Sequence, residues 1–299
     1  MRPKASKPGR SRHLPSSSRS LRAGFRLVLI TALLLAEGVG RSSAQGVVIP
    51  NFWDPRARQD RPDLAGLRTL RFLTDEDYPP LHFAGPDGNP TGFTVEIARA
   101  ACELLAISCT IQTRRFDTLL DTLRDGGGDV VAAAIPVTAD VRRRFAATLP
   151  YFRNPGRFVA RRDRGAPEPN PRALDGRAVG VVEGTAHEAY LKAFFPRAAL
   201  KGFAELPAAE AALRRGELDY LFADGVSLAL WIGGTEAAGC CSFAGGSYLE
   251  SRFFGEGIGL VMRKDDDLVR RALEHALQRL WDEGKYAELY LRFFPVAPF

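Results

Sequence analysis

Polar side chains that can hold a small charged solute stand where predicted strands end and helices begin. Asp75 and Tyr78 follow the first predicted strand. Gly184 and Thr185 stand between a later strand and its helix, and Asp224 ends another strand. Ligands of open α/β sheets lie at the carboxyl ends of strands, and a helix N-terminus offers free N–H groups to an anion.

These residues suit a solute that carries both a carboxylate and an ammonium group. Gly184 and Thr185 can hold the carboxylate, while Asp224 faces the ammonium group and Tyr78 covers an apolar part. Each residue also has an ordinary structural alternative: Thr185 as a helix N-cap, Asp224 as a turn acid and Tyr78 as a surface aromatic. The set taken together favours a binding site.

Short apolar runs alternate with amphipathic segments from Leu67 onward, which predicts an α/β layered fold. A polar, Pro-rich stretch at 161–171 is expected to connect two lobes. Strands near 157–160 and 257–262 link the two α/β sets, and two lobes joined in this way form a hinged clamshell. The predicted strands are 69–74, 109–113, 130–135, 178–182, 220–223 and 257–262; the predicted helices are 93–105, 118–124, 186–195, 208–215 and 268–281.

The positive charge of the chain belongs to its first 44 residues. The whole sequence has 41 Lys and Arg against 35 Asp and Glu, a net charge of +6. Nine of the bases and one acid lie in residues 1–44, which leaves 32 bases and 34 acids from residue 45 onward. A folded part with a net charge of −2 lacks the basic footprint of a nucleic-acid-binding protein, so no nucleic-acid partner is expected.

Residues 1–44 have the three parts of a secretory signal peptide: a basic stretch, an apolar run at 27–35 and the small residues that end at Ala44. The apolar run is about half of the roughly 20 residues that cross a bilayer, so cleavage is expected rather than a membrane anchor. The cleavage site has no Cys for a lipid anchor. Residues 45–66 have no regular period and are expected to form an N-terminal extension.

All four cysteines follow this leader, in a part of the chain that the leader would send to an oxidising compartment. Four cysteines allow three pairings, among which the sequence does not choose. A bridge between Cys102 and Cys109 would cross a short turn. Cys240 and Cys241 are adjacent in a Gly-rich loop, where they can bond to each other, stay reduced or pair between molecules. The histidines have no metal-site spacing to a Cys pair, so neither a metal nor another cofactor is expected.

Several short motifs occur in a fixed order along residues 67–296. They are TDEDYPPLHF at 74–83, DGNPTGFTVE at 87–96, GDVV at 128–131, TAD at 138–140, PY at 150–151, VVEGT at 181–185, GELD at 216–219, FGEG at 254–257 and DEGKY at 282–286. This ordered set resembles the extracellular solute-binding proteins, family 3, of polar amino-acid ABC transporters.

The resemblance implies an α/β fold: a two-lobed type II periplasmic-binding-protein clamshell with two crossover hinge strands. Lobe 1 would comprise residues 67–158 and 250–299, and lobe 2 residues 159–249. The spacing of Cys102 and Cys109 is similar to that of a disulfide in some members, which implies the same bond here.

The resemblance also implies which residues bind the ligand. The matching positions are Asp75, Tyr78, Thr138, Gly184, Thr185 and Asp224, together with Phe116 at an aromatic or apolar position that can alternatively be core. His82 lies just beyond the ligand loop and is expected to be structural or on the surface.

One position departs from the family pattern. Members that bind amino acids have an Arg three residues after the loop Thr, which pairs with the ligand α-carboxylate through two hydrogen bonds. Counting from Thr138, that place holds Val141, and the next residue is Arg142. A one-residue adjustment of the loop would restore the clamp through Arg142. The alternative is that the three consecutive arginines beginning there form a solvated helix face.

The sequence therefore predicts a monomeric periplasmic substrate-binding component of an ABC transporter. Binding of a small polar solute, an amino acid or a relative of one, would shift the open and closed populations, and an inner-membrane permease would recognise the closed form. No catalytic residue is expected. The alternatives are a periplasmic enzyme on the same fold, similar to cyclohexadienyl dehydratase with Glu183 or Asp224 as the cleft acid, and an accessory or sensory subunit.

Overall fold

The computed structural model describes Ile49, residues 60–294 and residues 297–298. The predicted signal peptide lies outside these residues, as does most of the predicted extension at 45–66. Ile49 and Leu64 are partly buried against a hydrophobic cluster of the first sheet. No helix in the described ranges is long and apolar enough to span a membrane.

The first sheet has five strands in the order β5-β1-β6-β13-β7. β1 (Thr69–Thr74) pairs in parallel with β5 (Ser108–Thr113) and with β6 (Val130–Val131). β13 (Val261–Met262) runs antiparallel to β6 and to β7 (Ala146–Ala147). The sheet therefore joins early strands to one from the last fifth of the chain.

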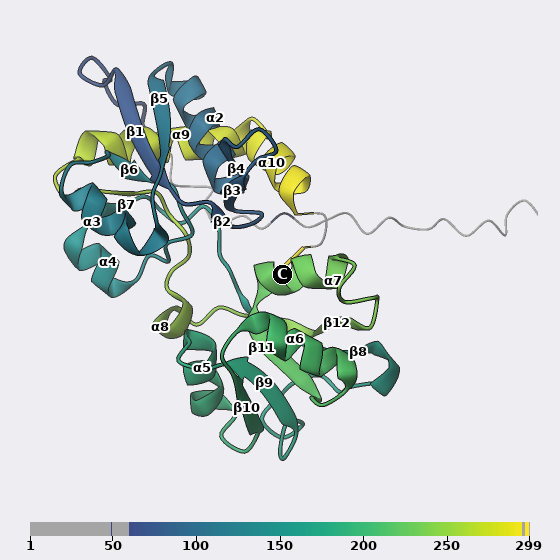
Figure 1. Cartoon of the computed structure of the whole chain (residues 1–299). Helices are drawn as coiled ribbons and strands as arrows, with labels where there is room; N and C mark the ends of the chain where they lie inside the picture. Colours follow the sequence, from purple (N-terminus) through teal and green to yellow (C-terminus); the bar gives the residue numbers. More distant parts are fainter. Residues whose placement is uncertain (1–48, 50–59, 295–296, 299) are drawn as a thin grey trace, which may run out of the picture. The chain divides into compact units, whose positions relative to one another are not determined.

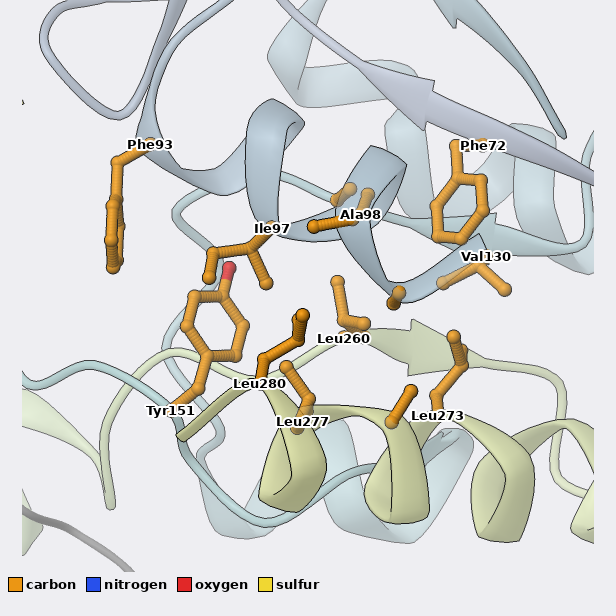
Figure 2. Packing of buried hydrophobic residues seen from close by; sticks show 14 of the residues in the cluster. Phe72, Phe93, Ile97, Ala98, Val130, Tyr151, Leu260, Leu273, Leu277 and Leu280 are labelled. Atoms are coloured by element: carbon orange, nitrogen blue, oxygen red, sulfur yellow. The ribbon is translucent and has the colours of Figure 1, made fainter. Parts of the chain in front are cut away.

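Three helices cover one face of this sheet: α2 (Phe93–Leu105), α9 (Asp267–Asp282) and α10 (Lys285–Phe293) (Figure 1). Phe72 of β1 points to this face and is fully buried among their apolar side chains. Figure 2 shows the cluster, in which Ile97 of α2 lies opposite the leucines of α9. Because successive strand residues point to opposite faces, the next residue of β1, Leu73, packs on the other face of the sheet.

That other face is covered by α3 (Leu119–Arg124) and α4 (Ala139–Arg144). Leu73 of β1 and Val141 of α4 meet there in a second hydrophobic cluster. Because Val141 faces the sheet, it is unable to serve as a solvent-facing ligand residue, and the following position, Arg142, is directed elsewhere.

A glycine and a disulfide hold α2 in place. Gly92, the residue before the helix, has φ 119°, and a Cβ there would lie 2.5 Å from the carbonyl oxygen of Leu81. Only glycine fits this turn. The disulfide that the resemblance implies, Cys102–Cys109, is present and joins α2 to β5.

The second sheet has the order β10-β9-β11-β8-β12 and repeats the pattern of the first. β9 (Ala178–Val182) pairs in parallel with β10 (Ala199–Phe203) and β11 (Tyr220–Asp224). β8 (Gly156–Arg161) lies antiparallel between β11 and β12 (Cys241–Tyr248).

Helices cover both faces of this sheet as well. Phe158 of β8 packs on the side of α5 (Ala186–Phe194). Its neighbour Val159 packs on the side of α6 (Leu206–Arg215) and α7 (Gly225–Gly233). The apolar strands are consistent with a sheet that is buried on both faces.

Two sequence-based expectations about this region were wrong. The stretch 161–171, expected to connect two lobes, lies between β8 and β9 of one sheet and includes the short helix η2 (Arg162–Arg164). Proline and charge mark a surface connection but do not say what it connects. Cys241 was expected in a loop but begins β12, where it is buried and bonded to Cys240.

The described residues also contain a small third sheet and a further short helix. β2 (Asp77–Tyr78), β3 (His82–Ala84) and β4 (Pro90–Thr91) form the sheet, in which Tyr78 pairs with His82. The helix is α8 (Ser251–Phe254). The predicted strand 257–262 is shorter than expected, because Ile258 makes only isolated bridges to Pro136 and Phe152.

Candidate functional site

A cavity of about 190 Å³ lies where the carboxyl end of β11 meets the start of α5. Most of its lining is apolar, but it contains one carboxylate, one phenol, one amide and one imidazole. No Lys or Arg of the described residues lines it. The lining residues are Tyr78, Ala134, Pro136, Asn154, Ala186, His187, Asp224, Phe253, Phe254, Gly257 and Ile258.

Three polar side chains from distant parts of the chain form a network at this cavity. The Tyr78 hydroxyl donates to Oδ1 of Asp224 at 2.8 Å. Nδ2 of Asn154 donates to the Tyr78 hydroxyl at 2.7 Å and lies 3.3 Å from Oδ1 of Asp224. The residues that a ligand would meet first are therefore held in place by one another.

The position of Asp224 follows from the end of its strand. Asp224 is the last residue of β11 and the N-cap of α7, and its Oδ1 accepts a hydrogen bond from the Ser227 backbone N–H at 2.8 Å. Every hydrogen bond to this carboxylate from the described residues goes to Oδ1. Oδ2 thus keeps its acceptor capacity for a cationic group of a ligand.

Tyr78 stays a hydrogen-bond donor over the whole physiological pH range. Burial raises the pKa of its phenol well above the usual value, and the negative charge of Asp224 raises it further. The protonated phenol donates to Asp224, so it supports the ionised carboxylate without competing for a ligand cation.

His187 lies in the first turn of α5 and lines the cavity together with Ala186. Its ring lies 5.1 Å from that of Phe254 and 5.6 Å from that of Phe222, measured between centroids. Burial lowers the pKa of His187, and the charge of Asp224 only partly opposes this effect. At neutral pH the ring is therefore uncharged, and the cavity carries one net negative charge from Asp224.

Gly184 and Thr185 precede this turn but do not line the cavity. The Thr185 hydroxyl donates to the carbonyl of Val182 at 2.7 Å and accepts from the backbone N–H of Glu188 at 3.3 Å. The carboxylate of Glu188 accepts in turn from the Gly184 N–H at 3.0 Å. These bonds resemble a capping box, except that Glu188 accepts from the residue before the N-cap, and the side chain of Thr185 shapes the start of α5.

Asp75 does not line the cavity. It is buried, and its Oδ1 lies 2.8 Å from Nδ1 of the fully buried His82, at an angle that falls short of a straight hydrogen bond. Nε2 of His82 accepts from the Ala134 backbone N–H at 3.0 Å. His82 is thus a structural residue, as expected, and it connects Asp75 to the cavity wall at Ala134.

Phe116 is also separate from this cavity. It lies in the short helix η1 (Phe116–Thr118) with 49% of its surface exposed. Together with Asp75 it lines an open hollow of about 760 Å³, whose other residues are mostly charged. The structure therefore places Asp75 and Phe116 together, but not with Tyr78 and Asp224.

Thr138 and Arg142 belong to α4. The Thr138 hydroxyl caps this helix by accepting from the Val141 N–H at 3.2 Å. Arg142 pairs with Glu256: its Nε lies 3.0 Å from both carboxylate oxygens, and its Nη2 contacts Oε2. In this structure the guanidinium group is thus occupied by a carboxylate of the same chain.

Two polar lining residues, Asn154 and His187, were absent from the sequence-based set. Asn154 precedes β8 by two residues, where the sequence contains no motif. His187 comes two residues after Thr185, so the first turn of that helix was a signal that could have identified it.

Residues 70–296 match the family described as bacterial extracellular solute-binding proteins, family 3. This chain belongs to that family. The L-arginine-binding protein of Pseudomonas aeruginosa is 29% identical over 236 residues, which cover 78% of this chain and 90% of the relative.

Solved structures of other proteins share this fold. A Salmonella typhimurium periplasmic binding protein described as having high arginine specificity is 25% identical, with a TM-score of 0.56 and coverage of 76% of this chain and 99% of that one. Substrate binding domain 2 of GlnP from Lactococcus lactis, in an open conformation, gives a TM-score of 0.67 at 17% identity and covers 77% of this chain and 96% of that one. The likeness confirms the α/β fold of type II periplasmic binding proteins for this family 3 chain.

Proposed function

We propose that this chain is the periplasmic substrate-binding subunit of an ABC transporter and that it binds an amino acid. The observation that carries the proposal is the Asp224 carboxylate, whose Oδ1 is held by Tyr78, Asn154 and the α7 cap while Oδ2 is left for an ammonium group. The similar proteins, which are described as binding arginine, support the same class of solute.

The other predicted site residues take more specific roles in this proposal. The N–H groups at the start of α5, shaped by Gly184 and Thr185, and the guanidinium of Arg142 receive the ligand carboxylate. Tyr78 covers the ligand side chain, whereas Phe116 lies at the separate hollow with Asp75 and is not part of the proposed cavity. Thr138 positions α4, and Asp75 holds the wall of the cavity through His82.

The proposed lobes are residues 67–158 with 250–299 and residues 159–249, with one change: 156–158 begin β8 of the second sheet and so belong to lobe 2. Two crossover segments join the lobes. Residues 1–44 would direct the chain to the periplasm and be removed there. The protein would act as a monomer without a cofactor, without catalysis, and would deliver its ligand to an inner-membrane permease.

A thermal melt of the purified protein against the twenty amino acids tests this function. A ligand at about a hundred times its dissociation constant adds roughly 2.7 kcal/mol of stability, which raises the melting temperature by several degrees. Stabilisation by one chemical group of amino acids is the expected result. Stabilisation by none of them, or chemical turnover of a bound solute such as prephenate, would contradict the proposal.

A further inference from the structure

The ion pair between Arg142 and Glu256 lies at the edge of the cavity. The backbone N–H of Glu256 donates to the carbonyl of Val137 at 3.0 Å, and the N–H of Val137 donates to the carbonyl of Gly257 at 2.8 Å. Pro136 and Gly257, the neighbours of these residues in sequence, line the cavity. Glu256 is therefore attached to the cavity wall by its backbone, and Arg142 reaches it from α4, which begins just after Val137.

The pair is also open to solvent and to a ligand. The side chains of Arg142 and Glu256 are 38% and 45% exposed. The guanidinium makes the two-pronged contact that it would make with a ligand carboxylate. The hydrogen bond from Arg142 holds the pKa of Glu256 below its usual value, so Glu256 is ionised at neutral pH.

We propose that Glu256 occupies Arg142 in the absence of ligand and that the ligand carboxylate displaces it. Glu256 is then a specificity-determining residue, because a solute binds Arg142 only if the carboxylate of the solute displaces that of Glu256. This inference rests on the proposed function and adds to it the residue against which the ligand competes.

The surroundings favour exchange over a permanent pair. An exposed ion pair contributes little to stability, about 0 to 1 kcal/mol, so its loss is easily offset. The positive charge of Arg153 also acts on Glu256 and keeps a cation nearby when Arg142 turns to a ligand. No Lys or Arg of the described residues lines the cavity. Among the three arginines of α4, Arg142 is the one that pairs with Glu256, whereas the other two pair with Asp140 of their own helix.

The test is isothermal titration of wild-type protein and the Glu256→Gln variant with each of the twenty amino acids and with the corresponding amino-acid amides, which lack the carboxylate. Removal of the competing charge is expected to tighten binding of the acid by about three- to fivefold, the size of an exposed ion pair. Binding of the amide is expected to change by less than about twofold, because the amide never needs Arg142. Glu256→Ala should act in the same direction, which guards against an effect peculiar to the glutamine side chain.

A matched control is Glu283→Gln. Glu283 also forms an exposed ion pair, with Arg279 of α9, but it does not line the cavity. This variant should bind as wild type does. Unchanged or weaker binding of the acid by Glu256→Gln, with wild-type binding intact, would overturn the inference and leave the proposed function standing. An equal gain for acid and amide would also overturn it. Absence of binding by wild type and variants to every amino acid would overturn both.

Discussion

Asp224 and Arg142 are the two charged side chains that we assign to the ligand, and their surroundings differ. Asp224 is partly buried and accepts hydrogen bonds from Tyr78, Asn154 and the backbone of α7. Arg142 is more exposed, and its guanidinium pairs, within the part of the chain that the structure describes, with the side chain of Glu256 alone. A charged group held by several hydrogen bonds is already positioned for a ligand. A charged group with one exposed partner can exchange that partner for a ligand.

The difference follows from where each residue stands. Asp224 ends a buried strand and begins a helix, so backbone geometry determines its side-chain position. Arg142 stands on a six-residue helix of which only Val141 is buried. The two sides of the proposed site should therefore respond differently to mutation, pH and salt.

The largest effect on binding is expected from Asp224→Asn. The amide oxygen can still accept the hydrogen bonds from Tyr78 and Ser227, but the negative charge is lost. Affinity for an amino acid that stabilises the wild-type protein should fall by about 1.5 to 3 kcal/mol, roughly ten- to a hundredfold, while the melting temperature changes little. Isothermal titration measures this change. Asp163→Asn, which alters an exposed carboxylate beside Arg161, is the control and should have no effect.

Asn154→Ala tests whether the Asp224 side is held in place by its network. The Tyr78 hydroxyl loses its donor and the Val226 N–H loses its acceptor at 3.3 Å, so the free energy of unfolding should fall by about 1 to 2 kcal/mol. Urea denaturation checks the loss. Asn170→Ala, which removes an exposed turn amide, should cost less. Equal losses in the two variants would mean that the network contributes nothing special.

A smaller effect is expected from the titration of His187. Its pKa is lowered in the folded protein, so the unfolded chain takes up a proton more readily as the pH falls. The stability from neutral His187 is complete above the ordinary His pKa of about 6.5 and is lost as the pH falls through that value toward the lowered pKa. Urea denaturation at pH 7.5 and pH 5 should show a smaller decline for His187→Asn than for wild type. In the control variant His275→Asn, His187 is still present, so its contribution to the fall in the free energy of unfolding should remain. Identical falls in wild type and both variants would show that His187 does not cause this pH dependence.

The smallest effect on stability is expected from Arg142→Ala. Loss of an exposed ion pair should change the free energy of unfolding of the ligand-free protein by less than about 1 kcal/mol, and the change should shrink further at high salt. Denaturation at low and high ionic strength checks both statements. A loss as large as that of Asn154→Ala would show that the Arg142 side is as rigid as the Asp224 side.

Much of the fold follows from local pattern. The strands at Thr69–Thr74 and Ala178–Val182 and the helix Phe93–Leu105 have the bounds that their apolar spacing predicts. β10 and β12 were missed, since β10 has little buried surface and β12 contains two consecutive glycines. Such strands are formed by pairing with a neighbour, which local spacing does not reveal.

The candidate site shows the same division. Asp224, which lines the cavity, was predicted from the end of its strand, and the helix start at Thr185, whose side chain does not line the cavity, from its capping signal. Asn154 could not be identified, because its role depends on Tyr78, which is 76 residues away, and on Asp224, which is 70 residues away.

The sequence by itself determined the kinds of groups available: a carboxylate after one strand, a capped helix start after another, and an arginine one place beyond the family position. Only the tertiary structure decided their partners. It joined Tyr78 to Asp224, Asp75 to His82 and Arg142 to Glu256. The physical reason is that a residue's type and its neighbours in the chain set its chemistry and local conformation, whereas the charge or hydrogen-bond partner that it meets is supplied by segments brought close only when the sheets and helices pack.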